Sequence, residues 1–362
     1  MIINTKLFIT FLICIGSSEI FTMERAESSH LNKEQLALRQ QVIDDAVINM
    51  LKARGIQIVA EYKIPDFLKR SPKTAQELAK LTGLQANPLH RLLSMLASHG
   101  YFTQDTQERF SLTALSQILT SDAPNSIAEY VKTPNNYWWD TIRDLDYSIK
   151  TGKSSFEKNE GKSFWQALQE NPQQGARFFK GMGNYSMPEN DVFASMINCS
   201  KFKTVVDIGG GQGGLIKAIM TRCPTIKGIL FDMENVISQV TPMQKLKTVA
   251  GDFFKEVPAR ADAYLLKRVL LDWDNVKSAQ ILKTIAHAMH DNSKLFIIDG
   301  IIHGVNKRDV AKDWDILMQG LFAGKNKTEK DFEEILDQAG LELISIKPTD
   351  FGIAIIETKL KK

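Results

Sequence analysis

The stretch VVDIGGGQGG, residues 205–214, decides the fold of this chain. It begins as an apolar run rich in β-branched residues, continues into a glycine-rich turn and leads into the helical pattern that starts at Leu215. A buried strand that enters such a turn and then a helix is the opening unit of a parallel α/β sheet. Glycine is needed because the backbone must turn sharply and let a ligand approach closely. We therefore expect an α/β domain with a ligand at this turn.

After residue 203 the chain alternates β-rich runs with helical stretches. The predicted strands are TVVDI (204–208), KGILFD (227–232), KTVAGDF (247–253), DAYLLKRVL (262–270), KLFIIDGII (294–302), ELISIKP (342–348) and GIAIIETK (352–359). Helices are predicted at 215–223, 276–289 and 328–339. This rhythm predicts a doubly wound, Rossmann-like α/β domain over residues 203–362, with helices on both faces of a mostly parallel seven-stranded sheet. The last two strands predict a terminal hairpin that contains one antiparallel strand.

Two classes of cofactor must be weighed at the glycine-rich turn. Gly209, Gly211 and Gly214 satisfy the GxGxxG spacing of nicotinamide and flavin sites. Asp207, however, comes two residues before the first of these glycines, where its carboxylate would face the ligand. That charge would repel a pyrophosphate and attract the ammonium and sulfonium groups of S-adenosylmethionine. Asp232, at the end of the next strand, is placed to accept hydrogen bonds from both ribose hydroxyls.

A third strand end supports the same choice. Gly251 is followed by Asp252, a carboxylate for the adenine amine, and by Phe253, an aromatic ring for the adenine face. These strand ends share the edge at which open α/β sheets bind ligands. The sequence therefore favours S-adenosylmethionine as the cofactor.

Residues 33–121 predict a winged helix-turn-helix. Thr74 and Glu77 form a capping box for a helix that stops at Gly83, and a second helix runs from near Pro88 to Gly100. A small hairpin follows, formed by residues 101–103 and 110–112. Such a module binds DNA or forms a dimer.

The charge pattern favours the dimer. Near its start, the second helix offers only Asn87, His90 and Arg91 to read bases or phosphates, whereas DNA sites usually take several Lys and Arg contacts. The apolar helix at residues 44–51 supplies a face that a dimer would bury. We expect a homodimer formed through this domain, and no nucleic-acid partner.

Residues 122–202 are predicted to be helical and are rich in aromatic side chains. Most of these rings must pack in the interior. A subset is expected to line a pocket for a flat, apolar, hydroxylated small molecule at the domain junction.

Composition limits the class of protein. The 362 residues are 43% hydrophobic and 24% charged, with a formal net charge of +3, which is too small to indicate a polyanionic partner. Cys14, Cys199 and Cys223 show no metal-ligand spacing. No cluster of His, Asp or Glu has such spacing either, so we expect no metal site. We expect the two late cysteines to be buried free thiols, in agreement with a reducing cytoplasm.

Residues 1–32 are predicted to be a disordered segment that is either signal-like or mis-started. Lys6 precedes the apolar run LFITFLICIG (7–16), as in a signal peptide, and the run is too short to span a membrane. Alternatively, translation begins at Met23, which we favour because S-adenosylmethionine is made in the cytoplasm. A cytoplasmic location without membrane attachment is therefore expected, with export as the alternative.

From about Gln40 to its end, the chain resembles the dimeric small-molecule O-methyltransferases of plants and bacteria, such as the caffeate, flavonoid and hydroxyneurosporene enzymes. The resemblance rests on VVDIGGGQGG, FDMENVI, GDFFKEVP, AYLLKRVLLDWD and GKNKTEKDF. It implies a winged-helix dimerisation domain and an S-adenosylmethionine cofactor. By position it implies cofactor contacts at Asp207, Gly209, Gly211, Asp232, Met233, Asp252, Phe253, Lys267 and Ser186. It implies substrate contacts at Met182, Trp273, Asp315 and Met318.

The resemblance breaks at the catalytic base. The family uses a histidine directly before an Asp-Trp pair, held by two downstream acidic residues, and this position is Leu271 in the present chain. The two acidic positions are similar to Asp299 and Asn326. Leucine cannot accept a proton, and a general base typically contributes about 10²–10⁴ in rate. Of the neighbouring histidines, His287 and His290 are expected on the outer face of a helix. His303 is expected to be structural or solvated, with a position in the cavity as the less favoured alternative.

Three hypotheses follow. The chain is a methyltransferase that works by proximity and orientation on an acidic or non-oxygen nucleophile. Alternatively, it is an S-adenosylmethionine-dependent enzyme of another class, such as a hydroxylase or decarboxylase. The third hypothesis is an inactive cofactor-binding or DNA-binding regulator. We favour the methyltransferase, because the cofactor edge is retained as a whole.

Overall fold

The computed structural model of the chain describes residues 31–134 and 136–362, and the described residues divide into two units between Leu51 and Lys52. The signal-like run, Met23 and Cys14 lie outside the described residues. Within the described part of the chain, no helix is both long enough and apolar enough to cross a bilayer.

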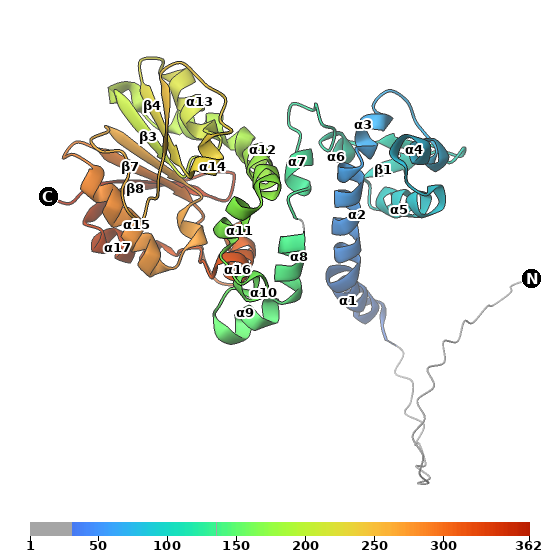
Figure 1. The fold of residues 1–362 in the computed structure, drawn as a ribbon. Coiled ribbons are helices and arrows are strands. Elements are labelled where there is room, and N and C mark those ends of the chain that lie inside the picture. The colour runs from blue at the N-terminus through green and yellow to red at the C-terminus, as the bar shows by residue number, and fades with distance from the viewer. Residues whose placement is uncertain (1–30, 135) are drawn as a thin grey trace, which may run out of the picture. The chain divides into compact units, whose positions relative to one another are not determined.

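The second unit contains one large sheet, in which β3, β4, β7 and β8 are labelled in Figure 1. Its strand order is β5-β4-β3-β6-β7-β9-β8. The strands are β3 (Thr204–Ile208), β4 (Lys227–Asp232), β5 (Leu246–Ala250), β6 (Ala263–Lys267), β7 (Lys294–Asp299), β8 (Leu341–Pro348) and β9 (Ala354–Leu360). Neighbours from β5 to β7 pair in parallel, and β9 is antiparallel to both β7 and β8. The predicted doubly wound sheet with a terminal hairpin is confirmed.

Three strands end earlier than predicted: β7 stops at Asp299 rather than at residue 302, and the early ends of β5 and β6 shape the cavity described below. The run KTVAGDF stops pairing at Ala250, and the Asp252 carboxylate then accepts the Phe254 N–H in a turn. The run DAYLLKRVL stops at Lys267, because Arg268 adopts a left-handed φ of 55°. A 3-10 turn, η3 (Leu270–Asp272), follows at once. This change of direction separates the Leu271 segment from the sheet.

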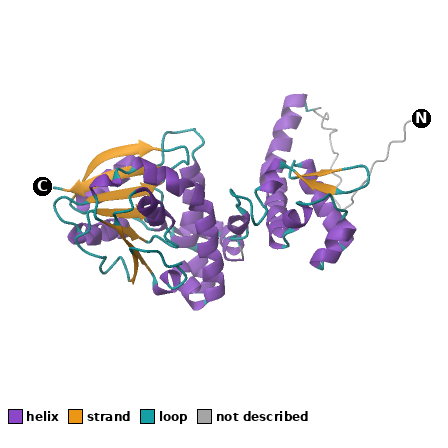
Figure 2. Ribbon diagram, turned by 90° about the horizontal axis from the view of Figure 1, so that it is seen from above, coloured by secondary structure: helices purple, strands orange, loops and turns teal. Residues whose placement is uncertain are grey.

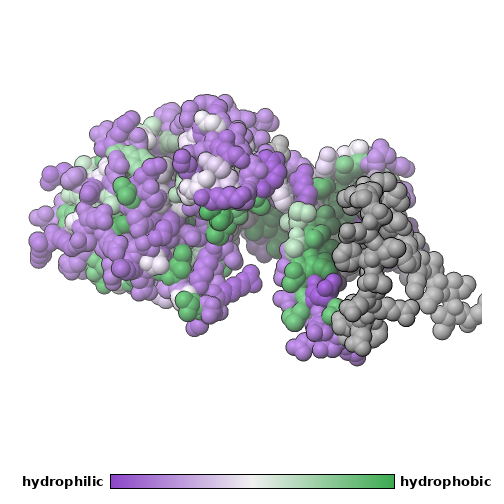
Figure 3. All heavy atoms as spheres, turned by 90° about the horizontal axis from the view of Figure 1, so that it is seen from below, coloured by the Kyte–Doolittle hydropathy of each residue, from purple (hydrophilic) through white to green (hydrophobic). Residues whose placement is uncertain are grey.

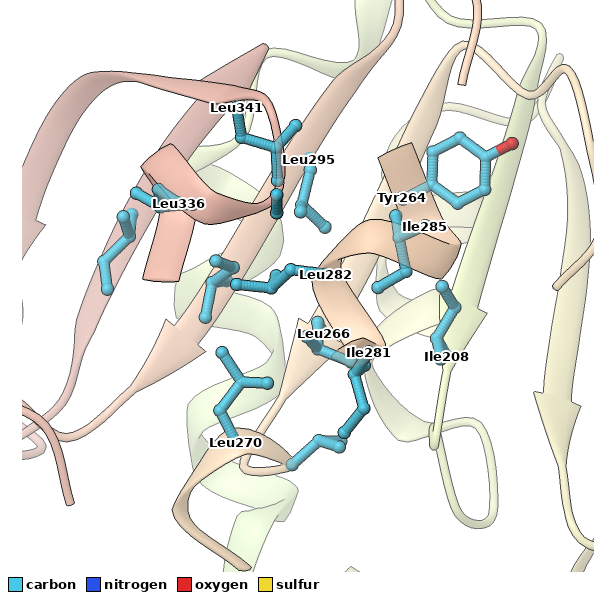
Figure 4. Close-up of a cluster of buried hydrophobic side chains, with 14 of the residues drawn as sticks. Ile208, Tyr264, Leu266, Leu270, Ile281, Leu282, Ile285, Leu295, Leu336 and Leu341 are labelled. Atoms are coloured by element: carbon cyan, nitrogen blue, oxygen red, sulfur yellow. The ribbon is translucent and has the colours of Figure 1, made fainter. Parts of the chain in front are cut away.

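Helices cover both faces of the sheet (Figure 2). The helices after β3 are α13 (Gly214–Arg222), α14 (Glu234–Ile237), α15 (Asn275–Ala288), α16 (Val310–Phe322) and α17 (Glu329–Gln338). The three predicted helices are present to within one residue, whereas α14 and α16 were not predicted. On one face, Leu282 and Ile285 of α15 and Leu336 of α17 are fully buried against the strands (Figure 4). Burial of such side chains stabilises the fold by about 2 kcal/mol each.

The region before the sheet is helical, as predicted. It contains α7 (Ala128–Val131), α8 (Asn136–Arg143), α9 (Leu145–Thr151), α10 (Ser155–Glu160), α11 (Phe164–Glu170), α12 (Pro172–Met196) and the 3-10 turn η2 (Cys199–Lys201). The long helix α12 packs on both α7 and α13. It therefore brings its middle residues next to the glycine-rich turn at the start of α13.

The winged helix-turn-helix is confirmed in detail. Its elements are α2 (Asn49–Glu61), α3 (Ile64–Leu68), α4 (Ala75–Thr82), α5 (Ala86–Ser98), β1 (Phe102–Gln104), β2 (Phe110–Leu112) and α6 (Ala114–Gln117). Thr74 caps α4 in a capping box with Glu77, and Gly83 ends it in the left-handed conformation. Strands β1 and β2 pair as the antiparallel wing. The residue boundaries that we assign to the domains stay a prediction.

The N-terminal helical residues expose many apolar side chains, and Figure 3 shows apolar spheres gathered on this helical region. The elements here are α1 (Lys33–Ile43) and the π-helix η1 (Asp44–Ile48). No side chain of either element is buried. The exposed apolar residues include Leu36, Leu38, Val42, Ile43, Val47, Met50 and Leu51.

The two late cysteines correct our expectation. Cys199 of η2 and Cys223, which caps the end of α13, form a disulfide rather than two free thiols. Cys199 is buried, as expected, in the core formed by α12, α13 and the sheet. Sequence separation hid the pairing, because the two residues meet only once α12 has packed on α13. Cysteine usage therefore gives no support to a reducing compartment.

Candidate active site

The glycine-rich turn surrounds a carboxylate that has no partner. Asp207, the fourth residue of β3, is 1% exposed, and neither of its carboxylate oxygens has a hydrogen-bond partner. Desolvation raises the pKa of Asp207 to about 7. A Cβ atom on Gly210 would lie 2.6 Å from the Asp207 carboxyl carbon, so glycine is required there. A buried carboxylate left without donors indicates that a cationic ligand group completes this site.

The second carboxylate of the cofactor edge holds the turn itself. At the end of β4, Asp232 accepts the Gly211 N–H at 2.8 Å through one oxygen and the Met233 N–H at 2.7 Å through the other. Burial raises the pKa of Asp232. Each of its oxygens keeps a second lone pair, which is what a ribose diol needs from its acceptor.

A buried network joins the end of β6 to α12. Lys267 donates to the Asn190 side-chain oxygen at 2.6 Å, and Arg268 pairs with Glu189, which is 4% exposed. Desolvation lowers the pKa of Lys267 to about 8. This network holds α12 against the end of β6, and Asn190 and Lys267 line the same small cavity as the unpartnered Asp207.

A cavity of about 1240 Å³ extends from this edge into the helical region. The predicted site residues that line it are Gly209, Gly211, Asp232, Met233, Asp252, Phe253, Lys267, Ser186, Met182, Trp273, Met318, Leu271, Asp299 and Asn326. Asp207 lines a small adjoining cavity of about 40 Å³, together with Ser186 and Lys267. Asp315 is not among the described residues that line either space; its carboxylate accepts the Asn326 N–H at 2.6 Å instead.

The far end of the cavity has aromatic walls. Tyr130 stacks on Tyr185 with ring centroids 4.5 Å apart, and the Arg268 guanidinium lies 4.8 Å from the Tyr185 ring. Trp165 and Phe322 stack at 5.4 Å on another wall. These rings stack on one another and give the cavity flat apolar walls, which suit a planar aromatic ligand.

Leu271 lines the same cavity. It is half-buried in the 3-10 turn η3 and packs on the aromatic cluster. Its backbone N–H donates to the Asp299 carboxylate at 3.2 Å, and the other Asp299 oxygen accepts the Gly300 N–H at 2.9 Å. Asn326 is 2% exposed and donates its side-chain N–H to the Ala311 carbonyl. The three positions of the predicted base constellation are therefore brought together without an imidazole.

The three histidines that follow Leu271 in the sequence do not place an imidazole in the cavity. His303 is exposed and lies 3.6 Å from Glu329, which agrees with the favoured expectation that it is structural or solvated and excludes the alternative that it reaches the cavity. The loop that follows β7 carries it to the surface. His287 is exposed, and His290 is half-buried beside Asp262, away from the cavity. Among the residues that the structure describes, no three His, Cys, Asp or Glu side chains are grouped so as to hold a metal ion.

Comparison with known proteins identifies this arrangement. The sequence profile of the O-methyltransferase domain matches residues 142–342, and that of the O-methyltransferase dimerisation domain matches residues 49–122. The chain belongs to the O-methyltransferase family.

Individual relatives agree. The mitomycin biosynthesis 6-O-methyltransferase of Streptomyces lavendulae is 32% identical over 89% of this chain and 95% of its own length. The structure of the mitomycin 7-O-methyltransferase MmcR is similar, with a TM-score of 0.84, 32% identity, and coverage of 91% of this chain and 100% of that one. An O-methyltransferase from neocarzinostatin biosynthesis, in complex with S-adenosyl-L-homocysteine and 1,4-dihydroxy-2-naphthoic acid, has a TM-score of 0.74 and 26% identity, and covers 86% and 96%.

This O-methyltransferase is therefore an S-adenosylmethionine-dependent enzyme, as predicted. The residues present fit the cofactor, because the unpartnered Asp207 carboxylate offers a buried anion to its cationic groups. The dimerisation domain supports a homodimer. The roles of individual site residues, and the assignment of Leu271 to the base position, stay predictions.

Besides Asn190, sequence reasoning missed four polar residues at this site. Lys327 is 1% exposed and donates to the carbonyl oxygens of Leu270, Trp273 and Lys325. Asp272, Arg268 and Glu189 also line or brace the cavity. Asp272 and Lys327 each stand next to a residue that we did identify, so proximity to the base position was the available signal. Nothing in the sequence pairs Glu189 with Arg268, because that contact depends on the packing of α12.

Proposed function

We propose that this O-methyltransferase methylates a hydroxyl group of a small, flat aromatic molecule by aligning it with the cofactor, without a histidine base. S-adenosylmethionine supplies the methyl group from its positively charged sulfur. The observation that carries the proposal is a single cavity that is lined by the carboxylates of the cofactor edge, by aromatic side chains and by Leu271.

We assign the cofactor's ammonium group to Asp207, its ribose to Asp232, and its adenine to Asp252 and Phe253. Two observations support these roles. The Asp207 carboxylate oxygens have no hydrogen-bond partner. Asp232 at the end of β4, and Asp252 and Phe253 after the end of β5, line the cavity. Lys267 and Asn190 hold the α12 side of the turn. Ser186, Met233, Gly209 and Gly211 complete the cofactor walls.

We assign the substrate to the space bounded by Met182, Trp273 and Met318, all of which line the cavity. Asp315 lies behind this space and positions the Asn326 backbone. The naphthoic acid bound by the neocarzinostatin relative is a flat aromatic molecule, which supports a substrate of this shape.

Alignment must compensate for the missing imidazole. Loss of a general base typically costs about 10²–10⁴ in rate, whereas holding two reactants in line contributes several kcal/mol. The cavity walls supply that alignment through packing. We therefore expect the best substrates to carry an acidic hydroxyl, such as one conjugated to a carbonyl group.

The test is methyl transfer from radiolabelled S-adenosylmethionine to a panel of naphthols, hydroxynaphthoic acids and hydroxyquinones. Incorporation of label into an aromatic hydroxyl supports the proposal. No transfer to any member, although S-adenosylhomocysteine binds in calorimetry, overturns it. A product whose mass changes without methyl gain, with oxygen consumed, would instead support a non-methylating tailoring enzyme.

We further propose that the exposed apolar face of α1 and η1 is covered by a second copy of the chain, and that the winged helix binds no nucleic acid. We place the enzyme in the cytoplasm, without membrane attachment, where its cofactor is made. The exposed apolar residues support the dimer. Sedimentation at several concentrations tests it, and duplex DNA in fluorescence anisotropy tests the second point. A monomer, or a steep dependence of DNA affinity on salt, would contradict these proposals.

A further inference from the structure

Two carboxylates flank Leu271, and only one of them was expected. Asp299 lies at the end of β7 and is tied to the turn through the Leu271 N–H. Asp272 follows Leu271 directly in η3 and lines the same cavity. No described residue donates a hydrogen bond to the Asp272 carboxylate in the structure. Each Asp299 oxygen accepts one backbone N–H and keeps a second lone pair. The pair therefore has free acceptor capacity beside the position where the family keeps its base.

A buried cation balances this pair without hydrogen-bonding to it. The Lys327 ammonium donates to three backbone carbonyls, those of Leu270, Trp273 and Lys325. An ammonium group has three donors, so all of them are used. Its charge nevertheless acts on both Asp272 and Asp299. The charge of Lys327 thus favours the ionised form of both carboxylates, while none of its N–H donors is directed at their oxygens.

The charges around the pair set its proton affinity. Desolvation raises the pKa of Asp299 to about 6, while Lys327 and Arg268 oppose the shift. Desolvation and the charge of Asp299 raise the pKa of Asp272 well above its ordinary value. On α16, Asp315 is the further charged group that feels Lys327. Two interacting carboxylates titrate as one unit, so the pair is best treated as a single proton acceptor.

We propose that the Asp272–Asp299 pair accepts the proton of the substrate hydroxyl during methyl transfer. In this step the O–H bond breaks and the proton goes to a carboxylate oxygen. The O–CH₃ bond forms as the S–CH₃ bond breaks, and its electron pair stays on sulfur. One negative charge on the pair and one positive charge on sulfur are neutralised together. The inference rests on the proposed methylation and changes its mechanism, because a proton acceptor remains where the imidazole is absent.

A purely structural role makes a different prediction. If Asp272 and Asp299 only held the η3 turn, their loss would impair every substrate alike. A proton acceptor matters only for a hydroxyl that is still protonated. The acidity of the substrate therefore separates the two roles.

The experiment compares 1-naphthol, which is un-ionised at pH 8, with 4-nitro-1-naphthol, which is ionised. The full-length variants are Asp272→Asn, Asp299→Asn and the double variant, with Asp272→Glu as the conservative replacement. Asp313→Asn removes an exposed carboxylate on the neighbouring α16 and serves as the matched control. Binding of S-adenosylhomocysteine in calorimetry shows that each variant keeps its cofactor edge.

With 1-naphthol, the double variant is expected to lose about 10²-fold in kcat/KM, and the fall in rate below about pH 6 is expected to disappear. With 4-nitro-1-naphthol the same variant is expected to lose less than about threefold, and Asp272→Glu is expected to restore part of the 1-naphthol rate. An equal loss on both probes, or no loss on either, overturns the inference while methylation stands. If the wild type methylates neither probe nor any other aromatic hydroxyl, the proposed function fails, and the inference fails with it.

Discussion

The two ends of the cavity differ in how many of the residues implied by the family resemblance are present. At the cofactor edge, Asp207 and Asp232 remain at the ends of β3 and β4, and the turn between them keeps its glycines. At the reaction end, Leu271 and Asn326 stand where the family resemblance implies a base and an acidic residue. If these assignments hold, the chain keeps the cofactor-binding positions and differs from the family at the position of the base.

The difference shows that binding and proton transfer are separable tasks of one cavity. The cofactor edge needs charge in a buried place, and no neutral residue supplies it. The reaction end needs a proton acceptor only when the hydroxyl holds its proton firmly. A chain that keeps the buried charge of the cofactor edge but lacks the histidine base can still act as an enzyme. It must then use more acidic nucleophiles or transfer the proton to other groups.

The largest effect is expected at Asp207. Asp207→Asn keeps the side-chain size and removes the only charge that is buried without a partner in β3. Removing one member of a buried charge pair typically costs about 2–5 kcal/mol, so the Kd for S-adenosylmethionine should rise at least about 30-fold. Isothermal titration calorimetry measures this change.

Asp291→Asn is the matched control for that variant, because Asp291 is an exposed carboxylate in the turn before β7. It should leave the Kd within about twofold. If Asp207→Asn also left the Kd unchanged, the charge of Asp207 would not contribute to cofactor binding. The proposed difference between the two ends of the cavity would then be wrong.

A second effect concerns the support of the cofactor edge. The disulfide ties the end of α13 to the segment after α12, and it closes a loop with a sequence separation of 24. A loop of this length typically contributes about 3 kcal/mol, chiefly by restricting the unfolded chain. The Cys199→Ala, Cys223→Ala double variant should lose about that free energy of unfolding in urea titration. It should keep its Kd for the cofactor. A wild type that titrates two free thiols without denaturant would contradict the pairing.

Local features of the structure could be predicted from the sequence, whereas contacts between residues far apart in the chain could not. Capping of α4 by Thr74 and the glycine-rich turn after β3 are local, so short patterns predicted them well. The ends of β5 and β6 were missed because propensity continues past the point where pairing stops. The Cys199–Cys223 disulfide and the Arg268–Glu189 pair were missed because they join segments whose contact depends on how α12 packs.

The third prediction acts on the reaction end directly. Leu271→His places an imidazole in η3 between Asp272 and the Asp299 carboxylate that bonds its backbone. For 1-naphthol we expect kcat/KM to rise about tenfold, which is less than the full value of a base because Asn326 cannot help to orient the ring. For 4-nitro-1-naphthol we expect no gain.

Leu271→Met is the matched control, since it keeps an apolar side chain of similar volume. Steady-state kinetics with both naphthols measure the effect. A loss of activity with both substrates would show that the reaction requires the packing of Leu271. An added base at position 271 would then not increase the rate.

The smallest effect is a pH dependence of the cofactor edge. The ordinary pKa of Asp207 is 3.8, and in the folded chain it is raised to about 7 by desolvation. Between these values the folded state binds more protons than the unfolded state. The free energy of unfolding of the cofactor-free enzyme should therefore fall as pH rises from about 4 to about 7, and then level off. Asp207→Asn removes this slope in urea titrations at several pH values.

Cofactor binding should show the opposite trend. A cationic ligand prefers the ionised carboxylate, so affinity falls when Asp207 takes up its proton. With a pKa near 7, the ionised fraction drops roughly fivefold between pH 7 and pH 6, and the Kd for S-adenosylmethionine should rise by about that factor. Calorimetry in buffers of different ionisation enthalpy should show a proton released on binding at pH 6. Binding that is independent of pH, without proton release, would mean that Asp207 is ionised before the ligand arrives. The cofactor edge would then owe its affinity to Asp232 and the adenine contacts rather than to the charge at the end of β3.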